Sequence, residues 1–442
     1  MNEYLIANVG NRDVLLDGGP IDEPLIKGKE ILEQYEAYEA RLSFPLFEKL
    51  VRNKSYEKIY LIVTDQKGEL EDSYRKKDTR YFGEIIKKAH STLAIDTFPL
   101  MGNPASYDNA FHSYAPFYET ILQAHGDTDS LYYISLSGGT CAQNTASLYH
   151  GSIIFGENCQ PVHVSEKESD IQYLKAASSI RRKVAVEHAK SSLGRYEYRS
   201  AYEQLKNESN DSLVLALLDY ADFRSKFQFK KASTALGKGR KPKGMESLLF
   251  RRLTDECTRL EENDPAQLLL ELSHLIRKYH HVGMFNEAFA LLFRFVESAL
   301  HYYVEKLTGA PLSSHDASDK NNKEKKILSY IQSNSSLHDF LDTKSINFES
   351  FPLSRMTLIA ILEYFAKEKR MEEQAYIAIK KINDKANERN QGIFGHGTKT
   401  ISGIDPALLS NMAFIVSDIC TDTDTSFVYD EINKLVLGLL GC

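Results

Sequence analysis

The sequence predicts an α/β Rossmann-like N-terminal domain, with a parallel-rich sheet and helices on both faces, followed by an all-α C-terminal domain. From Tyr4 to about His163, short apolar runs alternate with amphipathic stretches. After about residue 170 the strand signals fade, and long stretches with helical periodicity take their place. Buried strands that alternate with helices at this spacing are typical of βαβ units in a parallel sheet.

The N-terminal elements follow one another along residues 1–175. The apolar runs YLIANV, KIYLIVTD, SLYYISL and SIIFG are separated by a helix-like stretch over residues 25–51, by EIIKKAHSTLAIDTFPL, and by a second helix-like stretch around residues 115–124. The helical part of the chain is predicted to consist of a linker region over residues 176–260 and a C-terminal domain over residues 261–442.

Composition narrows the class of protein. The 442 residues carry a formal net charge of −7 and five scattered cysteines without a CxxC pair, so neither a zinc site nor a disulfide framework is expected. No window approaches the roughly 18 apolar residues that a membrane helix needs. The start, MNEYLIANVGNRD, has no basic segment followed by an apolar one, which favours the cytoplasm.

Three small, polar loops follow predicted strands, at the edge where open parallel sheets bind ligands. They are Gly10-Asn11-Arg12-Asp13, Thr64-Asp65-Gln66 and Ser137-Gly138-Gly139-Thr140. A Ser-Gly-Gly-Thr turn before a helix lets backbone N–H groups approach a phosphate, because glycine has no Cβ. The alternative is a tight strand-to-helix turn without a ligand. The absence of GxGxxG and of a Walker A lysine disfavours a dinucleotide oxidoreductase and a P-loop NTPase.

A second group of candidate residues lies near the end of a helical stretch, where Arg389-Asn390 is followed by His396. RNA can be cleaved without a metal ion when its 2′-OH attacks the adjacent phosphate. That reaction needs a proton-transfer group of near-neutral pKa and a permanent cation for the phosphorane. Histidine and arginine supply these two groups, and Asn390 adds a neutral hydrogen bond.

These motifs resemble those of CRISPR-associated type III ancillary ribonucleases. The segment from Arg389 to His396 is similar to the R-x6-H motif of HEPN ribonucleases, and the GNRD and SLSGGT loops look like the two ligand loops of CARF domains. The resemblance implies a homodimer that cuts single-stranded RNA, requires no metal, is activated by cyclic oligoadenylate and acts in antiviral defence. It implies Arg389, Asn390 and His396 as active-site residues and, as ligand residues, Gly10, Asn11, Arg12, Ser137, Gly138, Gly139 and Thr140; Thr64, Asp65 and Gln66 match by position.

A basic island interrupts this acidic chain. Between Arg224 and Arg252 there are ten Lys or Arg residues and one acidic residue, Glu246. Interleaved Phe223, Phe227 and Phe229 suit stacking with single-stranded bases. The alternative is a solvated segment whose aromatic rings pack on a neighbouring helix.

Two other functions compete with the ribonuclease. One is a cyclic-nucleotide-sensing regulator or effector without nuclease activity. A winged-helix regulator would need a helix-turn-helix followed by a β-hairpin, and the sequence after residue 400 contains no such strand pair. The other is a binding-only protein with a degenerate nuclease domain, which the presence of both Arg389 and His396 opposes.

Overall fold

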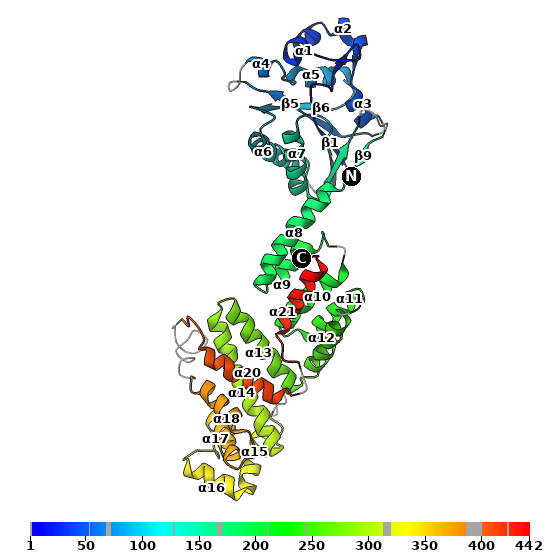
Figure 1. The fold of residues 1–442 in the computed structure, drawn as a ribbon. Coiled ribbons are helices and arrows are strands. Elements are labelled where there is room, and N and C mark those ends of the chain that lie inside the picture. The colour runs from blue at the N-terminus through cyan, green and yellow to red at the C-terminus, as the bar shows by residue number, and fades with distance from the viewer. Residues whose placement is uncertain are drawn as a thin grey trace. The chain divides into compact units, whose positions relative to one another are not determined.

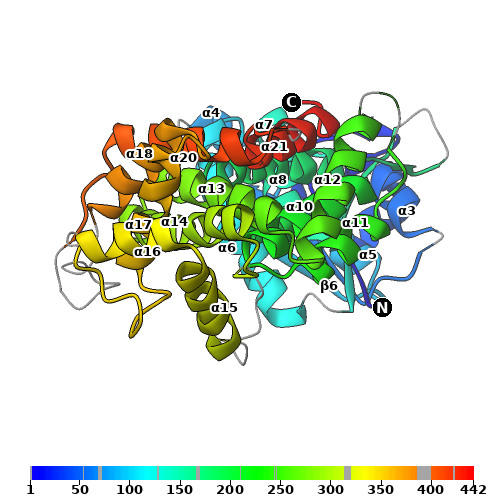
Figure 2. The same cartoon turned by 90° about the horizontal axis from the view of Figure 1, so that it is seen from below.

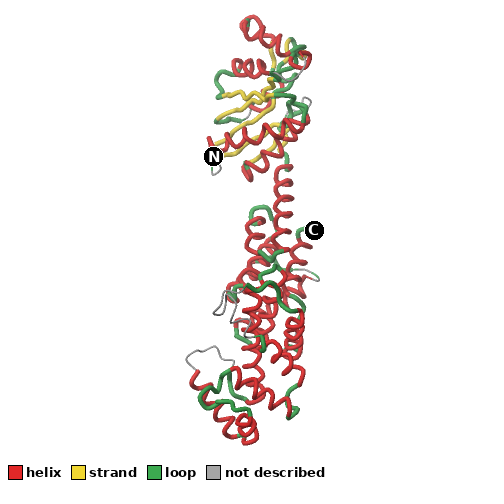
Figure 3. Tube along the Cα trace, turned by 90° about the vertical axis from the view of Figure 1, so that its left-hand side faces the viewer, coloured by secondary structure: helices red, strands yellow, loops and turns green. Residues whose placement is uncertain are grey.

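The computed structural model describes residues 2–52, 54–67, 72–126, 129–165, 170–209, 211–242, 244, 246–312, 320–385, 400–421 and 424–442. The chain divides into two compact units, Met1–Ala185 and Val186–Cys442. All strands among the described residues lie in the first unit (Figure 3). The predicted fold class, an α/β domain followed by an all-α domain, is confirmed.

The first unit is built around a six-stranded sheet (Figure 1). Its strand order is β6-β5-β1-β7-β8-β9, and only β9 is antiparallel to its neighbour. These strands are β1 (Asn2–Asn8), β5 (Lys58–Asp65), β6 (Ile95–Met101), β7 (Ser130–Ser135), β8 (Cys159–His163) and β9 (Gln172–Tyr173). A small second sheet consists of β2 (Leu15–Leu16), β3 (Gly19–Pro20) and β4 (Leu42–Ser43).

Helices cover both faces of the large sheet because side chains alternate between the faces along each strand. On β1, Leu5 and Ala7 pack in the core formed with α1, α3 and α5, whereas Tyr4 and Ile6 pack in the core formed with α6 and α7. The helices of this unit are α1 (Pro24–Glu33), α2 (Tyr35–Tyr38), α3 (Pro45–Val51), α4 (Asp72–Arg75), α5 (Arg80–Ala89), α6 (Tyr107–His125) and α7 (Cys141–Ile154).

Two details of the sequence-based assignment differ from the structure. The helix-like stretch over residues 25–51 is interrupted, because β4 lies between α2 and α3. The apolar run SIIFG was expected to alternate with helices as the strands do, yet Ser152–Ile154 ends α7. The strand that follows is β8, whose sequence CQPVH has a proline and few apolar residues.

The helical unit begins within α8 (Ala176–Gly194). It continues through α9 (Tyr198–Leu205), α10 (Ser212–Ser225), α11 (Phe229–Lys238), α12 (Glu246–Glu261), α13 (Pro265–His281), α14 (Phe285–Thr308), α15 (Lys320–Ser333), α16 (Ser335–Thr343), α17 (Arg355–Lys367), α18 (Glu373–Asn383), α20 (Pro406–Ile419) and α21 (Val428–Leu439). An extensive apolar core joins α13 to α20, and Leu292, Phe295 and Leu300 of α14 are fully buried in it.

A buried polar network joins α10, α12 and α21 to α13. Arg224 of α10 is fully buried and forms ion pairs with Glu256 of α12 at 2.7 Å and with Glu271 of α13 at 2.6 Å. The Tyr429 hydroxyl of α21 donates to the Glu271 carboxylate at 2.8 Å. Helix α21 therefore adds the last group to this network, and the other groups precede it in the sequence by more than 150 residues.

Candidate functional site

Three neighbouring parallel strands bring the predicted ligand loops to one edge of the sheet. Strand β1 lies between β5 and β7, with Ala7 paired to Leu61 on one side and to Ser135 on the other. The loops that follow these strands therefore leave the sheet at the same edge. The first and third loops, Gly10–Asp13 and Ser137–Thr140, are in direct contact.

Glycines make that contact possible. A Cβ added at Gly138 would lie 2.3 Å from the Asn8 carbonyl oxygen and 2.7 Å from Asp13 Oδ2, and one at Gly10 would lie 3.0 Å from the Gly139 nitrogen. Buried Asp13 accepts a hydrogen bond from the Gly10 N–H at 2.5 Å. Gly139 also has φ +75°, a conformation that favours glycine. The sequence predicted that these glycines let the backbone approach a phosphate. In the structure, the missing side chains at Gly10 and Gly138 let the two loops pack against each other.

Thr140 begins helix α7. Its hydroxyl accepts a hydrogen bond from the Gln143 N–H at 3.2 Å and donates to the Pro104 carbonyl at 2.5 Å, while its own N–H donates to Gln143 Oε1 at 2.9 Å. Ser137 Oγ accepts from the Val164 N–H at 2.6 Å. The hydroxyls of Ser137 and Thr140 are thus both hydrogen-bonded to backbone groups of the protein itself.

The backbone of the same loop offers hydrogen-bond donors. Among the described residues, the N–H groups of Gly138 and Gly139 have no acceptor, and Gly139 is exposed. They precede the N-terminus of the 14-residue helix α7, where the helix dipole favours negative charge. This arrangement is chemically suited to an anion such as phosphate.

A buried network of side chains, which the sequence did not predict, lies beneath the two loops. Tyr114 of α6 donates its hydroxyl hydrogen to Asn8 Oδ1, and Asn8 Nδ2 donates to Asn144 Oδ1 at 2.9 Å. Burial raises the pKa of Tyr114, so its hydroxyl remains a donor at physiological pH. The signal in the sequence was the polar residue Asn8 at the end of an apolar strand.

The second loop has a structural role in its own unit. Thr64 and Gln66 are buried, and Thr64 Oγ1 accepts from the Thr79 N–H at 2.9 Å. Gln66 donates to Asp78 through both its backbone N–H, at 2.9 Å, and its side-chain amide, at 2.7 Å. Asp65 forms ion pairs with Arg80 at 3.4 Å and with Lys67 at 3.3 Å. These hydrogen bonds and ion pairs anchor the loop to the start of α5.

Asn11 and Arg12 differ from the other predicted ligand residues because their side chains are exposed. Within the part of the chain that the structure describes, the Arg12 guanidinium has no ion pair or hydrogen bond. A cation at this edge, near the N-terminus of α7, is available for an anionic ligand.

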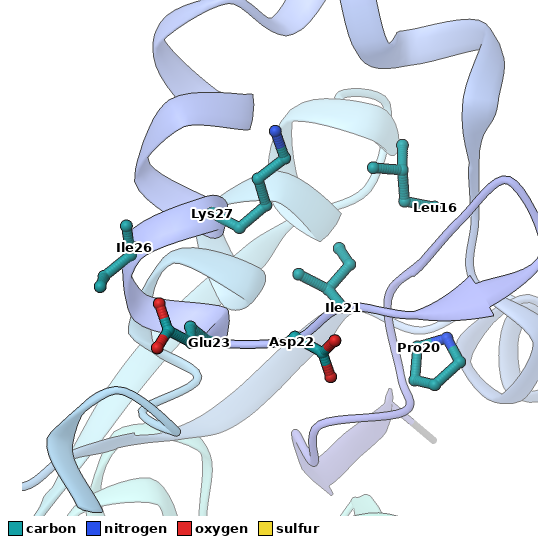
Figure 4. Close-up of a pocket in the computed structure, with 7 residues that line it drawn as sticks. All are labelled: Leu16, Pro20, Ile21, Asp22, Glu23, Ile26 and Lys27. Atoms are coloured by element: carbon teal, nitrogen blue, oxygen red, sulfur yellow. The ribbon is translucent and has the colours of Figure 1, made fainter. Parts of the chain in front are cut away.

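Two of the hollows formed by the described residues of this unit bear on where a ligand could bind. One, of about 20 Å³, lies under the loops and is lined in part by Asn8, Asp13 and Gly138, with room for about one water molecule. The other, of about 410 Å³, is lined by Leu16, Pro20, Ile21, Asp22, Glu23, Ile26 and Lys27 (Figure 4). None of the predicted ligand residues lines the larger hollow, and its two carboxylates disfavour a phosphate there.

Arg389, Asn390 and His396 lie outside the described residues, which resume at residue 400 after residue 385. Among the described residues, no group of three His, Cys, Asp or Glu side chains is placed to hold one metal ion. None of the helices in the described ranges is long and apolar enough to cross a membrane.

No family model matches the chain, and no curated protein matches its sequence. Among solved structures, it is similar to Enterococcus italicus Csm6 bound to cyclic hexa-2'-fluoro-hexa-dAMP, with a TM-score of 0.67 and 12% sequence identity. The match covers 99% of this chain and 100% of the other. The chain has the Csm6 fold. Csm6 thus shares, over its whole length, the expected fold of an α/β domain followed by an all-α domain.

Proposed function

We propose that this chain is a cyclic-oligoadenylate-activated, metal-independent endoribonuclease that cleaves single-stranded RNA in CRISPR type III antiviral defence. The observation that carries the proposal is the fold shared over 99% of the chain with Csm6, which was solved with a cyclic hexanucleotide bound. The loops Gly10–Asp13 and Ser137–Thr140 add independent support, because they combine backbone donors, a helix N-terminus and an exposed arginine.

In the sensor domain, residues 1–175, the activator is held by four groups. The N–H groups of Gly138 and Gly139 bind phosphate oxygens, and Asn11 and Arg12 reach the ligand with their side chains. Gly10, Ser137 and Thr140 shape the loops, while Thr64, Asp65 and Gln66 support them from the neighbouring strand. Two such sites related by the two-fold axis of a homodimer match the symmetry of a cyclic ligand.

In the ribonuclease domain, residues 261–442, His396 transfers the proton of the attacking 2′-OH. Arg389 stabilises the charge of the phosphorane, and Asn390 adds a neutral hydrogen bond. Residues 176–260 connect the two domains. The activator acts as a switch only if it binds the active arrangement of the dimer more tightly than the inactive one.

The decisive experiment is a titration of RNA cleavage against cyclic tri-, tetra- and hexa-adenylate, with and without EDTA. We expect one ring size to activate cleavage, EDTA to leave the rate unchanged, and His396→Ala to lower it by about 10²–10⁴-fold. Cleavage that EDTA abolishes would contradict the metal-free assignment. Binding of a cyclic oligoadenylate without any RNA cleavage would instead favour an effector without nuclease activity.

A further inference from the structure

Helix α11 presents a basic stripe to solvent. Its buried side consists of Ala232, Ala235 and Leu236. The opposite side carries Lys230, Thr234 and Lys238, which are exposed and spaced four residues apart. Lys230 and Lys238 are therefore two helical turns apart, about 12 Å along the axis.

Several cations of the basic island are neutralised by carboxylates within the fold, whereas two lysines at the start of α11 are not. Arg224 is buried between two glutamates, Arg240 pairs with Asp211 at 3.0 Å, and Lys226 pairs with Asp222 at 2.7 Å. In the described part of the chain, Lys230 and Lys231 have no carboxylate partner. A positive field thus remains over the first turn of α11 in a chain whose net charge is −7.

Phe227 stands beside this first turn in an unusual position. The Phe227 N–H donates to the Arg224 carbonyl at 3.0 Å and the Gln228 N–H to the Phe223 carbonyl at 3.0 Å, the Schellman pattern that ends α10. Phe227 occupies the position where glycine is usual, with φ +57°, and its side chain is 42% exposed.

A comparison within the chain shows what is unusual about this residue. Tyr196 has a similar φ of +54°, but it is 5% exposed and packs against Phe427 and His281. Burial of the Tyr196 ring offsets the backbone strain. Phe227 has less such compensation, because the ring contact found for it among the described residues is with Phe229, at 5.4 Å between centroids.

The scaffold holds the Phe227 turn rigidly. Arg224, whose carbonyl accepts the Phe227 N–H, is fixed by the ion pairs with Glu256 and Glu271. Helices α10, α11 and α12 pack together here (Figure 2). An exposed ring on an anchored turn, beside lysines without a carboxylate partner, has the two properties of a surface for single strands, a stacking platform and a track for the phosphate backbone.

We propose that the Phe227 turn and the exposed side of α11 bind the single-stranded RNA substrate through residues other than those assigned to cleavage. Phe227 stacks on one base, and Lys230, Lys231 and Lys238 contact phosphates. The inference rests on the proposed ribonuclease function. None of these groups reads a base edge, so the surface binds RNA without sequence preference.

The test measures binding of a single-stranded 2′-O-methyl oligouridylate, which cannot be cut because its 2′-oxygen is blocked. The full chain is compared with Lys230→Gln/Lys231→Gln/Lys238→Gln over a range of salt concentrations. Losing three phosphate contacts should lower the slope of log K against log salt by about 2. The control, Lys77→Gln/Lys87→Gln/Lys434→Gln, changes the net charge equally at exposed lysines elsewhere and should leave the slope unchanged.

A second pair of variants separates stacking from strain. Phe227→Gly should raise the melting temperature by relieving φ +57°, yet weaken RNA binding by about 5- to 150-fold. Phe227→Leu keeps the strain and removes the ring, so it should weaken binding without raising the melting temperature.

The outcomes separate this inference from the function on which it rests. If the full chain binds the oligonucleotide and the lysine variant keeps the wild-type slope, the α11 surface is wrong and the ribonuclease function stands. If the full chain neither binds nor cuts RNA, both are wrong. A slope that falls equally in the control variant would assign the effect to net charge and also overturn the surface.

Discussion

Replacing Gly138 by alanine tests whether contact between the two loops is required for sensing. The added Cβ would lie 2.3 Å from the Asn8 carbonyl oxygen, whereas real Cβ contacts essentially never fall below 3.0 Å. The second obstacle, Asp13 Oδ2 at 2.7 Å, is itself tied to the Gly10 N–H. The loops must therefore separate, and overpacking of this kind costs about 1–3 kcal/mol.

Two measurements follow from that magnitude. For a unit of 185 residues, the melting temperature of Gly138→Ala should fall by about 2–12 °C. The same displacement moves the N–H groups of Gly138 and Gly139, so half-maximal activation of RNA cleavage should need about 5- to 150-fold more cyclic oligoadenylate.

A matched control exists in the same unit. A Cβ at Gly19 would have its nearest neighbour at 3.8 Å, an ordinary contact, so Gly19→Ala should stay within about 0.5 kcal/mol of wild type. Equal melting temperatures and equal activation curves for the Gly138 and Gly19 variants would refute the reasoning. Aspartate at residues 138 and 139 would be a poorer probe of phosphate binding, because even a methyl group disturbs the loops.

Three further predictions concern single side chains. Arg12→Ala should leave the melting temperature unchanged and raise the activator requirement by about 10- to 150-fold, since its exposed guanidinium is not part of the packing; an unchanged activation curve would place the ligand elsewhere. Arg389→Lys should lower cleavage steeply while activator binding persists, because lysine lacks the two-point fork; near wild-type cleavage would contradict the assigned role. Arg224→Met should lower the free energy of unfolding in urea by about 3–5 kcal/mol, since it leaves Glu271 buried without a cation and Glu256 with Arg252 alone. A loss below about 1 kcal/mol would contradict this role of Arg224.

The fold class was predictable from the sequence because periodicity is a local property. Along β1, the alternation of Tyr4, Leu5, Ile6 and Ala7 between two cores is readable from the order of residues alone. Strand β8 was not readable, because Pro161 interrupts the pattern. The break in the helix-like stretch at β4 depends on pairing between Leu15 and Ser43, which no local window contains.

The sequence predicted that the candidate loops lie together, but it did not predict which contacts their residues make within the protein. The sequence predicted that small polar loops after the strands gather at one edge of the sheet, and Gly10–Asp13 and Ser137–Thr140 do meet there. The partners of Gly138 lie some 130 residues earlier in the chain, so its packing against Asn8 had no signal in the sequence. The same holds for Gln66, whose two donors are taken by Asp78.

The return of α21 to the earlier helices sets an order for folding during synthesis. Glu271 leaves the ribosome 158 residues before Tyr429, Tyr196 leaves 234 residues before Asp430, and Leu193 leaves 240 residues before Asn433. About a third of the chain, the 158 residues from Glu271 to Tyr429, is thus translated before the Glu271 carboxylate can accept the hydrogen bond from Tyr429. Such long-range closure is slow and exposes incompletely packed surface to aggregation. A nascent chain that lacks α21 therefore leaves exposed the surfaces of α10 and α13 that α21 covers in the folded protein.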